Sequence, residues 1–133
     1  MLVRVLYVSE VCLGITADDI DRLVANARRR NRQLDLTGAL LVCDGHFAQA
    51  LEGQELLVEE TMRKIARDVR HRDLRVQQRA VITQRLFADW DMAFIDNTRC
   101  DDAFRGLLAG HLAPEAFLAA MEAWIQERKT API

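Results

Sequence analysis

Three neutral polar residues, Tyr7, Asn31 and Gln49, stand where the surrounding pattern is apolar. Gln49 is the clearest case, because it lies on a predicted strand between Phe47 and Leu51. A buried amide left without partners costs on the order of 1–3 kcal/mol there. A phenol and two amides can donate and accept hydrogen bonds without carrying charge. Such a set suits a flat, mostly apolar ligand whose edges bear carbonyls and ring nitrogens.

Each candidate also has a purely structural interpretation. A buried Tyr7 can be a core residue with a bonded hydroxyl, Asn31 can be a helix C-cap, and Gln49 can be tied to the backbone. In the structural interpretation, Asp68 ends a helix, and His71 is a solvated histidine in a loop. The pattern alone leaves both interpretations of Gln49 open.

A β-hairpin positions Gln49. Asp44-Gly45 between two apolar runs is typical of a two-residue turn with positive φ, so strands are predicted at 37–43 and 46–52. The register then opposes Leu40 to Gln49. One face of the hairpin carries Gly38, Leu40, Val42, Phe47, Gln49 and Leu51, and the other carries Ala39, Leu41, Cys43, Ala48 and Ala50. Both faces are largely apolar, so helices are expected on both sides of the sheet.

The remaining elements complete a βαββαββ order followed by helices. They are a strand at 2–8, a helix capped by Thr16, a helix at 55–67, strands at 74–82 and 90–95, and a helix from Pro114 with an apolar stripe of Phe117, Met121, Trp124 and Ile125. In the last strand, Trp90, Met92 and Phe94 should alternate onto one face. The order predicts an α+β fold with a ferredoxin-like sheet, two helices on one face and the C-terminal helices on the other.

The bulk properties indicate one ordinary globular domain in 133 residues with a net charge of −2. No nucleic-acid or membrane partner is expected from this charge, and no segment reads as a signal peptide or membrane span. Cys12, Cys43 and Cys100 form no paired motif, which favours reduced thiols, a cytoplasmic location and no metal site. No nucleophile–base pair or phosphate loop is recognisable, so an enzyme is not expected.

Five motifs, in order and at matching spacings, resemble the BLUF domains, a family of blue-light sensors that use flavin. They are Tyr7-x-Ser9, Asn31-x5-Thr37-Gly38-Ala39-Leu40-Leu41, Asp44-Gly45-x-Phe47-x-Gln49-x-Leu51-Glu52-Gly53, Ala66-Arg67-Asp68-x-Arg70-His71 and Phe87-x-x-Trp90-x-Met92. The resemblance spans residues 2 to about 95. It implies a flavin-binding domain at 1–96 and a C-terminal helical extension at 97–133 packed on that domain.

The resemblance implies FAD as the cofactor, with FMN possible, and a photochemical site. Tyr7 would give an electron and a proton to the excited flavin, and Gln49 would lie between the phenol and the N5 and O4 edge of the ring. Trp90 and Met92 would relay the change. The implied cofactor-binding residues are Tyr7, Arg30, Asn31, Gln49, Ile65, Asp68, Arg70 and His71.

The chain departs from the family pattern at four positions. Arg30 stands where Asn or His is common, and Ala27 where Ser is common. Leu36 replaces an Ile, and Asp91 stands where Ser is frequent. The departures at Arg30 and Ala27 concern the ring contacts and leave the pair of Tyr7 and Gln49 intact.

Two other functions fit parts of the pattern. A ferredoxin-like enzyme of the acylphosphatase kind would need an arginine in the loop after the first strand, and residues 9–14 contain none. The pattern alone slightly favours a protein-interaction module without a cofactor. The resemblance to the BLUF domains favours the flavin-binding sensor instead. An absorption spectrum separates the three. By analogy with short family members, we expect no separate output domain, a homo-oligomer, and a downstream protein that the sequence does not identify.

Overall fold

The computed structural model describes the backbone of residues 1–96 and 101–130, and the side chains of residues 1–96 and 102–127. The elements are β1 (Leu2–Val11), α1 (Ala17–Leu34), β2 (Thr37–Cys43), β3 (His46–Gln54), α2 (Glu55–Ala66), β4 (His71–Val81), β5 (Ala93–Asp96), α3 (Asp101–Leu108) and α4 (Pro114–Thr130). Within the described residues, Cys12 and Cys43 take part in no disulfide, and Cys100 lies outside that part of the chain.

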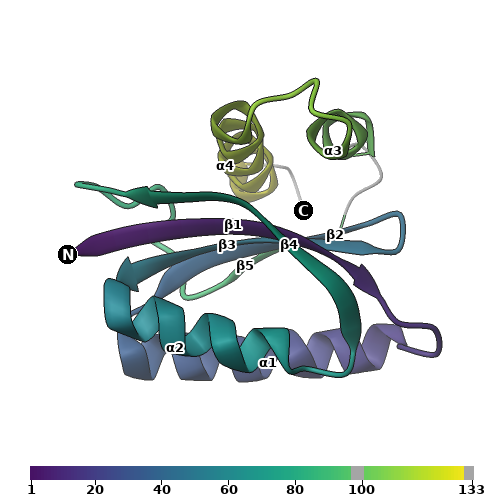
Figure 1. The fold of residues 1–133 in the computed structure, drawn as a ribbon, viewed down its shortest axis with the longest axis horizontal. Coiled ribbons are helices and arrows are strands. Elements are labelled where there is room, and N and C mark those ends of the chain that lie inside the picture. Colours follow the sequence, from purple (N-terminus) through teal and green to yellow (C-terminus); the bar gives the residue numbers. More distant parts are fainter. Residues whose placement is uncertain (97–100, 131–133) are drawn as a thin grey trace.

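The five strands form one sheet in the order β4-β1-β3-β2-β5. Neighbouring strands are antiparallel except β2 and β5, which are parallel. Helices α1 and α2 cover one face of the sheet, and α3 and α4 cover the other (Figure 1). We call these the near face and the far face. The predicted α+β, ferredoxin-like fold with helices on both faces is confirmed.

The hairpin between β2 and β3 has the predicted register. Asp44 and Gly45 take φ values of 50° and 73°, and Leu40 lies opposite Gln49. Gly38 allows the two strands to approach, because a Cβ at that position would lie 2.1 Å from the carbonyl oxygen of Ala50. The hairpin therefore delivers Gln49 to the near face, as the alternation along the strand predicts.

Helix α1 begins as predicted, but it ends beyond Asn31, which was one candidate for its C-cap. The Thr16 hydroxyl accepts from the backbone N–H of Asp19 at 3.1 Å, and the Asp19 carboxylate accepts from the backbone N–H of Thr16 at 2.9 Å. The C-cap is Asp35, in the left-handed conformation at φ 53°. The C-cap interpretation of Asn31 is therefore wrong, and Asn31 lies within α1 with its side chain fully buried.

Two apolar cores lie on the two faces of the sheet. The near-face core combines Val3, Val5, Val24, Ala27, Leu36, Leu40, Phe47, Leu51, Val58 and Met92. The far-face core combines alternate residues of the sheet with Phe104, Leu107, Phe117, Leu118, Met121 and Ile125 of α3 and α4. The predicted stripe on the last helix is thus the surface that covers the far face. The predicted division at residues 96 and 97 stays a prediction.

The fifth strand differs from its prediction. β5 begins at Ala93, so Trp90 and Met92 lie in the preceding loop. Met92 packs into the near-face core and Trp90 against the far-face core, so the expectation that they share one face is wrong. The Trp90 carbonyl accepts from Gly38 N–H at 3.2 Å, and the Met92 carbonyl accepts from Arg28 Nε at 2.9 Å. Both carbonyls are therefore bonded in the loop that precedes the parallel ladder, which begins at Ala93.

β4 also begins earlier than predicted, at His71, because β1 extends to Val11 and the two residues pair. Within the described residues, no helix combines the length and the apolar character that a membrane crossing needs.

Candidate functional site

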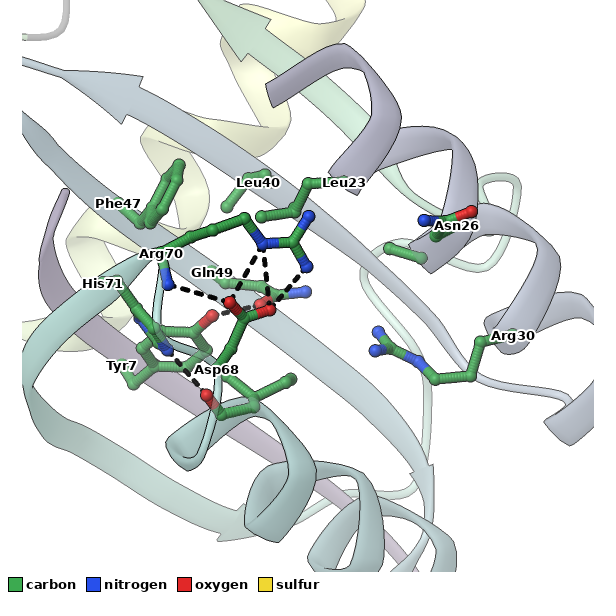
Figure 2. A pocket seen from close by; sticks show the side chains of 12 residues that line it. Tyr7, Leu23, Asn26, Arg30, Leu40, Phe47, Gln49, Asp68, Arg70 and His71 are labelled. Carbon is green, nitrogen blue, oxygen red and sulfur yellow. Dashed lines mark hydrogen bonds and ion pairs between the residues drawn. The ribbon is translucent and has the colours of Figure 1, made fainter. Parts of the chain in front are cut away.

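A cavity of about 240 Å³ lies between the near face of the sheet, α1 and α2. Its wall is formed by Tyr7, Leu23, Asn26, Ala27, Arg30, Leu40, Phe47, Gln49, Ile65, Asp68, Arg70 and His71. Apolar side chains make the broad surfaces, and polar groups stand at opposite ends. Asn26 and Arg30 project from α1, whereas Asp68, Arg70 and His71 follow α2 (Figure 2). The shape and chemistry suit a flat apolar ligand with polar edges.

Tyr7 and Gln49 form a hydrogen-bonded pair at the floor of this cavity. They are direct cross-strand partners on β1 and β3, and both are almost fully buried. The Tyr7 hydroxyl donates to Gln49 Oε1. Gln49 Nε2 in turn donates to the sulfur of Met92 at 3.7 Å. A buried chain of polar contacts therefore runs from the phenol, through the amide, to the loop before β5.

The electrostatics keep Tyr7 neutral. Burial raises the pKa of Tyr7 well above its ordinary value of 10.0. The Arg30 guanidinium acts in the opposite direction and lowers the pKa of Tyr7, while the Asp68 carboxylate raises it. The phenol is thus a hydrogen-bond donor, and no ordinary base removes its proton at neutral pH.

Asp68 and Arg70 neutralise each other at one end of the cavity. Asp68 Oδ1 accepts from the backbone N–H and from Nε of Arg70, each at 2.9 Å, and Oδ2 accepts from Arg70 Nη2 at 2.5 Å. The hydrogen bonds from Arg70 lower the pKa of Asp68, and those to Asp68 raise the pKa of Arg70. The pair places an oriented, charge-balanced group beside the ligand space (Figure 2).

His71 is part of the same end. Its Nε2 donates to the carbonyl oxygen of Ile65 at 2.6 Å, and its Nδ1 is hydrogen-bonded to the Ser9 hydroxyl at 2.7 Å. His71 is half-buried at the start of β4. The default interpretation as a solvated loop histidine is wrong, because β1 and the end of α2 bond both ring nitrogens.

Arg30 and Asn31 occupy the other end. Nε and Nη2 of Arg30 both donate to Asn31 Oδ1 at 3.2 Å, and Asn31 Nδ2 donates to the Asp91 carbonyl at 2.7 Å. Arg30 lines the cavity, whereas Asn31 is buried directly behind that lining. Burial lowers the pKa of Arg30, which nevertheless stays charged because a guanidinium is not deprotonated in proteins.

Two polar residues with clear roles in the structure, Asn26 and Glu52, were not predicted from the sequence. Asn26 lines the cavity, and its signal was its helical spacing from Leu23 and Arg30 on one face of α1. Glu52 is fully buried on β3, on the same alternation as Ala48 and Ala50 of the far face. A carboxylate on that covered face had to find partners. These partners are Arg4 Nε at 2.8 Å, the Thr37 hydroxyl at 3.1 Å, and the backbone N–H groups of Leu86 at 2.8 Å and Phe87 at 2.9 Å.

The fold and the cavity define an α+β domain with a slot for a flat ligand, and comparison with known proteins identifies its family. The BLUF family, described as sensors of blue light using FAD, matches residues 2–93, and the chain belongs to this family. Membership makes this part of the chain a sensor and not an enzyme.

The relatives place this module in proteins of different length. The chain is 34% identical over 92 residues to the photoactivated adenylate cyclase subunit beta of Euglena longa, covering 68% of this chain and 11% of that protein. It is 41% identical over 71 residues to the blue light- and temperature-regulated antirepressor BluF of Escherichia coli (strain K12), covering 53% and 18%. The dark-state structure of BlrB, a BLUF protein, has a TM-score of 0.80 at 30% identity and covers 96% of both chains. The chain thus spans about a tenth to a fifth of the two relatives' lengths.

The residues of the cavity fit a flavin. Leu23, Leu40, Phe47 and Ile65 are apolar wall residues that would suit the faces of a flat ring. Gln49, Asn26 and Arg30 carry N–H groups that could bond ring carbonyls and nitrogens. Within the described residues, no group of three or more His, Cys, Asp or Glu side chains could hold a metal ion.

Proposed function

We propose that this chain is a blue-light photoreceptor that binds FAD in the near-face cavity, with FMN as the alternative because it carries the same ring. Tyr7 and Gln49 are its photochemical pair. The observation that carries the proposal is the buried chain of contacts from the Tyr7 hydroxyl through the Gln49 amide to the Met92 sulfur at the cavity floor. A chain of neutral hydrogen-bond donors beside an apolar slot suits the light-driven transfer of an electron and a proton. It does not suit hydrolysis, which needs a nucleophile and a base.

The binding roles follow from the two polar ends of the cavity. Arg30, backed by Asn31, bonds the pyrimidine side of the ring. Asp68, Arg70 and His71 lie toward the ring's other polar edge or the phosphate-bearing tail. The remaining contacts are Tyr7, Gln49 and Ile65 of the cavity wall.

When bound, a flavin would supply the absorption of blue light and a ring that can take up an electron. Tyr7 would donate that electron, and its hydroxyl proton, strongly acidic after oxidation, would pass along the existing hydrogen bond to Gln49 Oε1. Tyr7 would then regain its electron and proton, and Gln49 would be left as a rotated or tautomeric amide with different partners. A stronger hydrogen bond from Gln49 to the carbonyl edge of the ring would shift the absorption to the red. No substrate is consumed, so the result is a switch between two hydrogen-bonded states.

The signal leaves through the loop before β5. A rotated Gln49 no longer donates from the same nitrogen to Met92, the residue that precedes β5. β5 contacts α4, and Trp90 of the same loop packs against the far-face core. Met92 and Trp90 thereby relay the change through the sheet to the far-face helices. The recipient is a downstream protein, with the receptor acting as a cytoplasmic homo-oligomer.

A light-minus-dark absorption spectrum tests the proposal. We expect purified protein to be yellow and to show a small red shift under blue light that reverses in the dark. Tyr7→Phe should keep the flavin and lose the shift, because the ring is retained without its hydroxyl. Protein that stays colourless with added FAD or FMN would overturn the proposal. Loss of flavin binding in Tyr7→Phe would instead make Tyr7 a structural residue.

A further inference from the structure

Arg30 is a cavity-facing cation without a carboxylate partner among the described residues. Its Nε and Nη2 donate to the neutral Asn31 Oδ1, each at 3.2 Å. The wall residues Asp68 and Arg70 are paired with each other. Arg30 therefore contributes a positive charge to the cavity wall that this pair leaves unbalanced.

The position of Arg30 makes this charge effective. The side chain is half-buried, and its guanidinium is turned toward the middle of the cavity (Figure 2). Apolar side chains surround the space, so the charge is screened less than on the surface. Its field reaches the floor of the site, since the Arg30 charge acts to lower the pKa of the buried Tyr7 phenol.

A charge in this place acts differently on a neutral and on an anionic ligand. Reduction of a flavin adds two electrons and one proton to the ring, which then carries one negative charge at neutral pH. Oxidised flavin has a neutral ring. Arg30 therefore stabilises the reduced ring more than the oxidised one, which is differential binding of the two forms.

We propose that Arg30 sets the reduction potential of the bound flavin, raising it by electrostatic stabilisation of the negatively charged ring, and so tunes how readily the cavity accepts an electron. This inference rests on the proposed function, since it requires flavin in the cavity. It makes Arg30 a tuning residue of the electron-transfer step in addition to a binding residue.

The test is a redox titration of the protein loaded with FAD, with dithionite as reductant and absorbance as readout. Removing the charge in Arg30→Gln should lower the potential. We expect a loss of about tenfold in the preference for reduced over oxidised flavin, which is about 30 mV for a two-electron couple. Arg30→Lys should retain most of the wild-type potential, because it keeps the charge. The matched control is Arg29→Gln, which removes the same charge from the neighbouring, exposed position of α1.

Weak binding does not remove the readout. If Arg30→Gln holds FAD loosely, the dissociation constants for oxidised and reduced FAD give the same quantity, because the coupling is reciprocal. Equal weakening of both constants would overturn the inference and leave Arg30 as a simple binding residue. An equal fall in the potential of Arg29→Gln would also overturn it, because the effect would then be one of net charge. Wild-type protein that binds neither FAD nor FMN would overturn the proposed function itself.

Discussion

Tyr7 is the only tyrosine of the chain, and its environment sets what it can do. Its side chain is almost fully buried, and its hydroxyl already donates to Gln49 Oε1. A phenolate in this place would lose both its solvation and the bond to an acceptor oxygen. The residue can therefore release its proton only after it has lost an electron, as the photochemical proposal requires.

The raised pKa of Tyr7 predicts a loss of stability at alkaline pH. The native state holds the phenolic proton more tightly than the unfolded chain, whose pKa is near 10.0. Below that pH both states are protonated, and the stabilising difference is complete. Above it the unfolded chain releases the proton and the native state does not, so the free energy of unfolding falls by up to about 1.4 kcal/mol per pH unit. Urea unfolding at a series of pH values measures this slope.

Tyr7→Phe is the control for the alkaline prediction, because it keeps the ring and removes the titrating group. The variant should lack the part of the slope that Tyr7 supplies. Near-ultraviolet absorbance gives a second readout, since the phenolate signal of native protein comes from one residue. Phenolate formation near pH 10 in the folded protein would contradict the account of a buried, neutral phenol.

At the scale of elements, the loop between β4 and β5 is held from two sides. On the near face, α1 bonds the Asp91 carbonyl through Asn31 and the Met92 carbonyl through Arg28. On the far face, the Glu52 carboxylate accepts the backbone N–H groups of Leu86 and Phe87. These contacts fix the loop that presents Met92 to Gln49. β3 thus carries both Gln49, the proposed photochemical amide, and Glu52, which anchors the loop that contacts it.

Glu52→Gln should destabilise the protein strongly. The amide would turn an N–H₂ group toward donors and leave Arg4 without its buried carboxylate, a change that typically costs about 3–5 kcal/mol. Urea unfolding measures the loss. Glu60→Gln is the matched control, because Glu60 is exposed on α2 and should change stability by no more than about 0.5 kcal/mol. Equal stability of the two variants would show that the Glu52 contacts anchor nothing.

Elements governed by neighbouring residues could be predicted from the sequence. Asp44-Gly45 determined the hairpin, and the hairpin register placed Gln49 opposite Leu40. Thr16 marked the start of α1 through a local capping box. Each of these depends on residues a few positions apart, which a sequence pattern records directly.

Features that depend on distant partners could not be predicted. The start of β5 depends on the bonds that Gly38 and Arg28 make to the loop, far away in the sequence. The alternation of Trp90 and Met92 therefore gave the wrong face for Trp90. His71 likewise looked solvated until β1 brought Ser9 beside it. At the candidate site, Tyr7 and Gln49 were found from the period of the strands, while Asn26 needed the position of α1 over the sheet.

At the scale of the whole molecule, the sheet is the shared floor of two cores. The near-face core surrounds the cavity, and the far-face core contains side chains of α3 and α4. Ala39, Leu41 and Ala50 lie under these helices with almost no exposure. We infer that the C-terminal helices stabilise the sheet that carries Tyr7 and Gln49, so the extension belongs to the same folding unit.

Phe117→Ala tests whether the C-terminal helices and the sheet unfold as one unit. Phe117 is fully buried in the far-face core, and truncation of a buried Phe typically costs about 3–5 kcal/mol. We expect helix loss by circular dichroism and flavin release to shift together to lower urea concentration. Leu13→Ala is the matched control, because Leu13 is 99% exposed and should leave the transition in place. Helix loss that precedes flavin release would show two separate units.

If the Gln49 amide is the switch, Gln49→Leu should abolish the response to light. Leucine fills the same space on β3 without either hydrogen-bonding atom, so the contacts to Tyr7 and Met92 disappear while the cavity keeps its apolar walls. The measurement is the light-minus-dark absorption spectrum of the flavin-loaded variant beside that of the wild type. We expect bound flavin and no reversible red shift in the variant. A red shift of wild-type size that reverses in the dark would contradict the account.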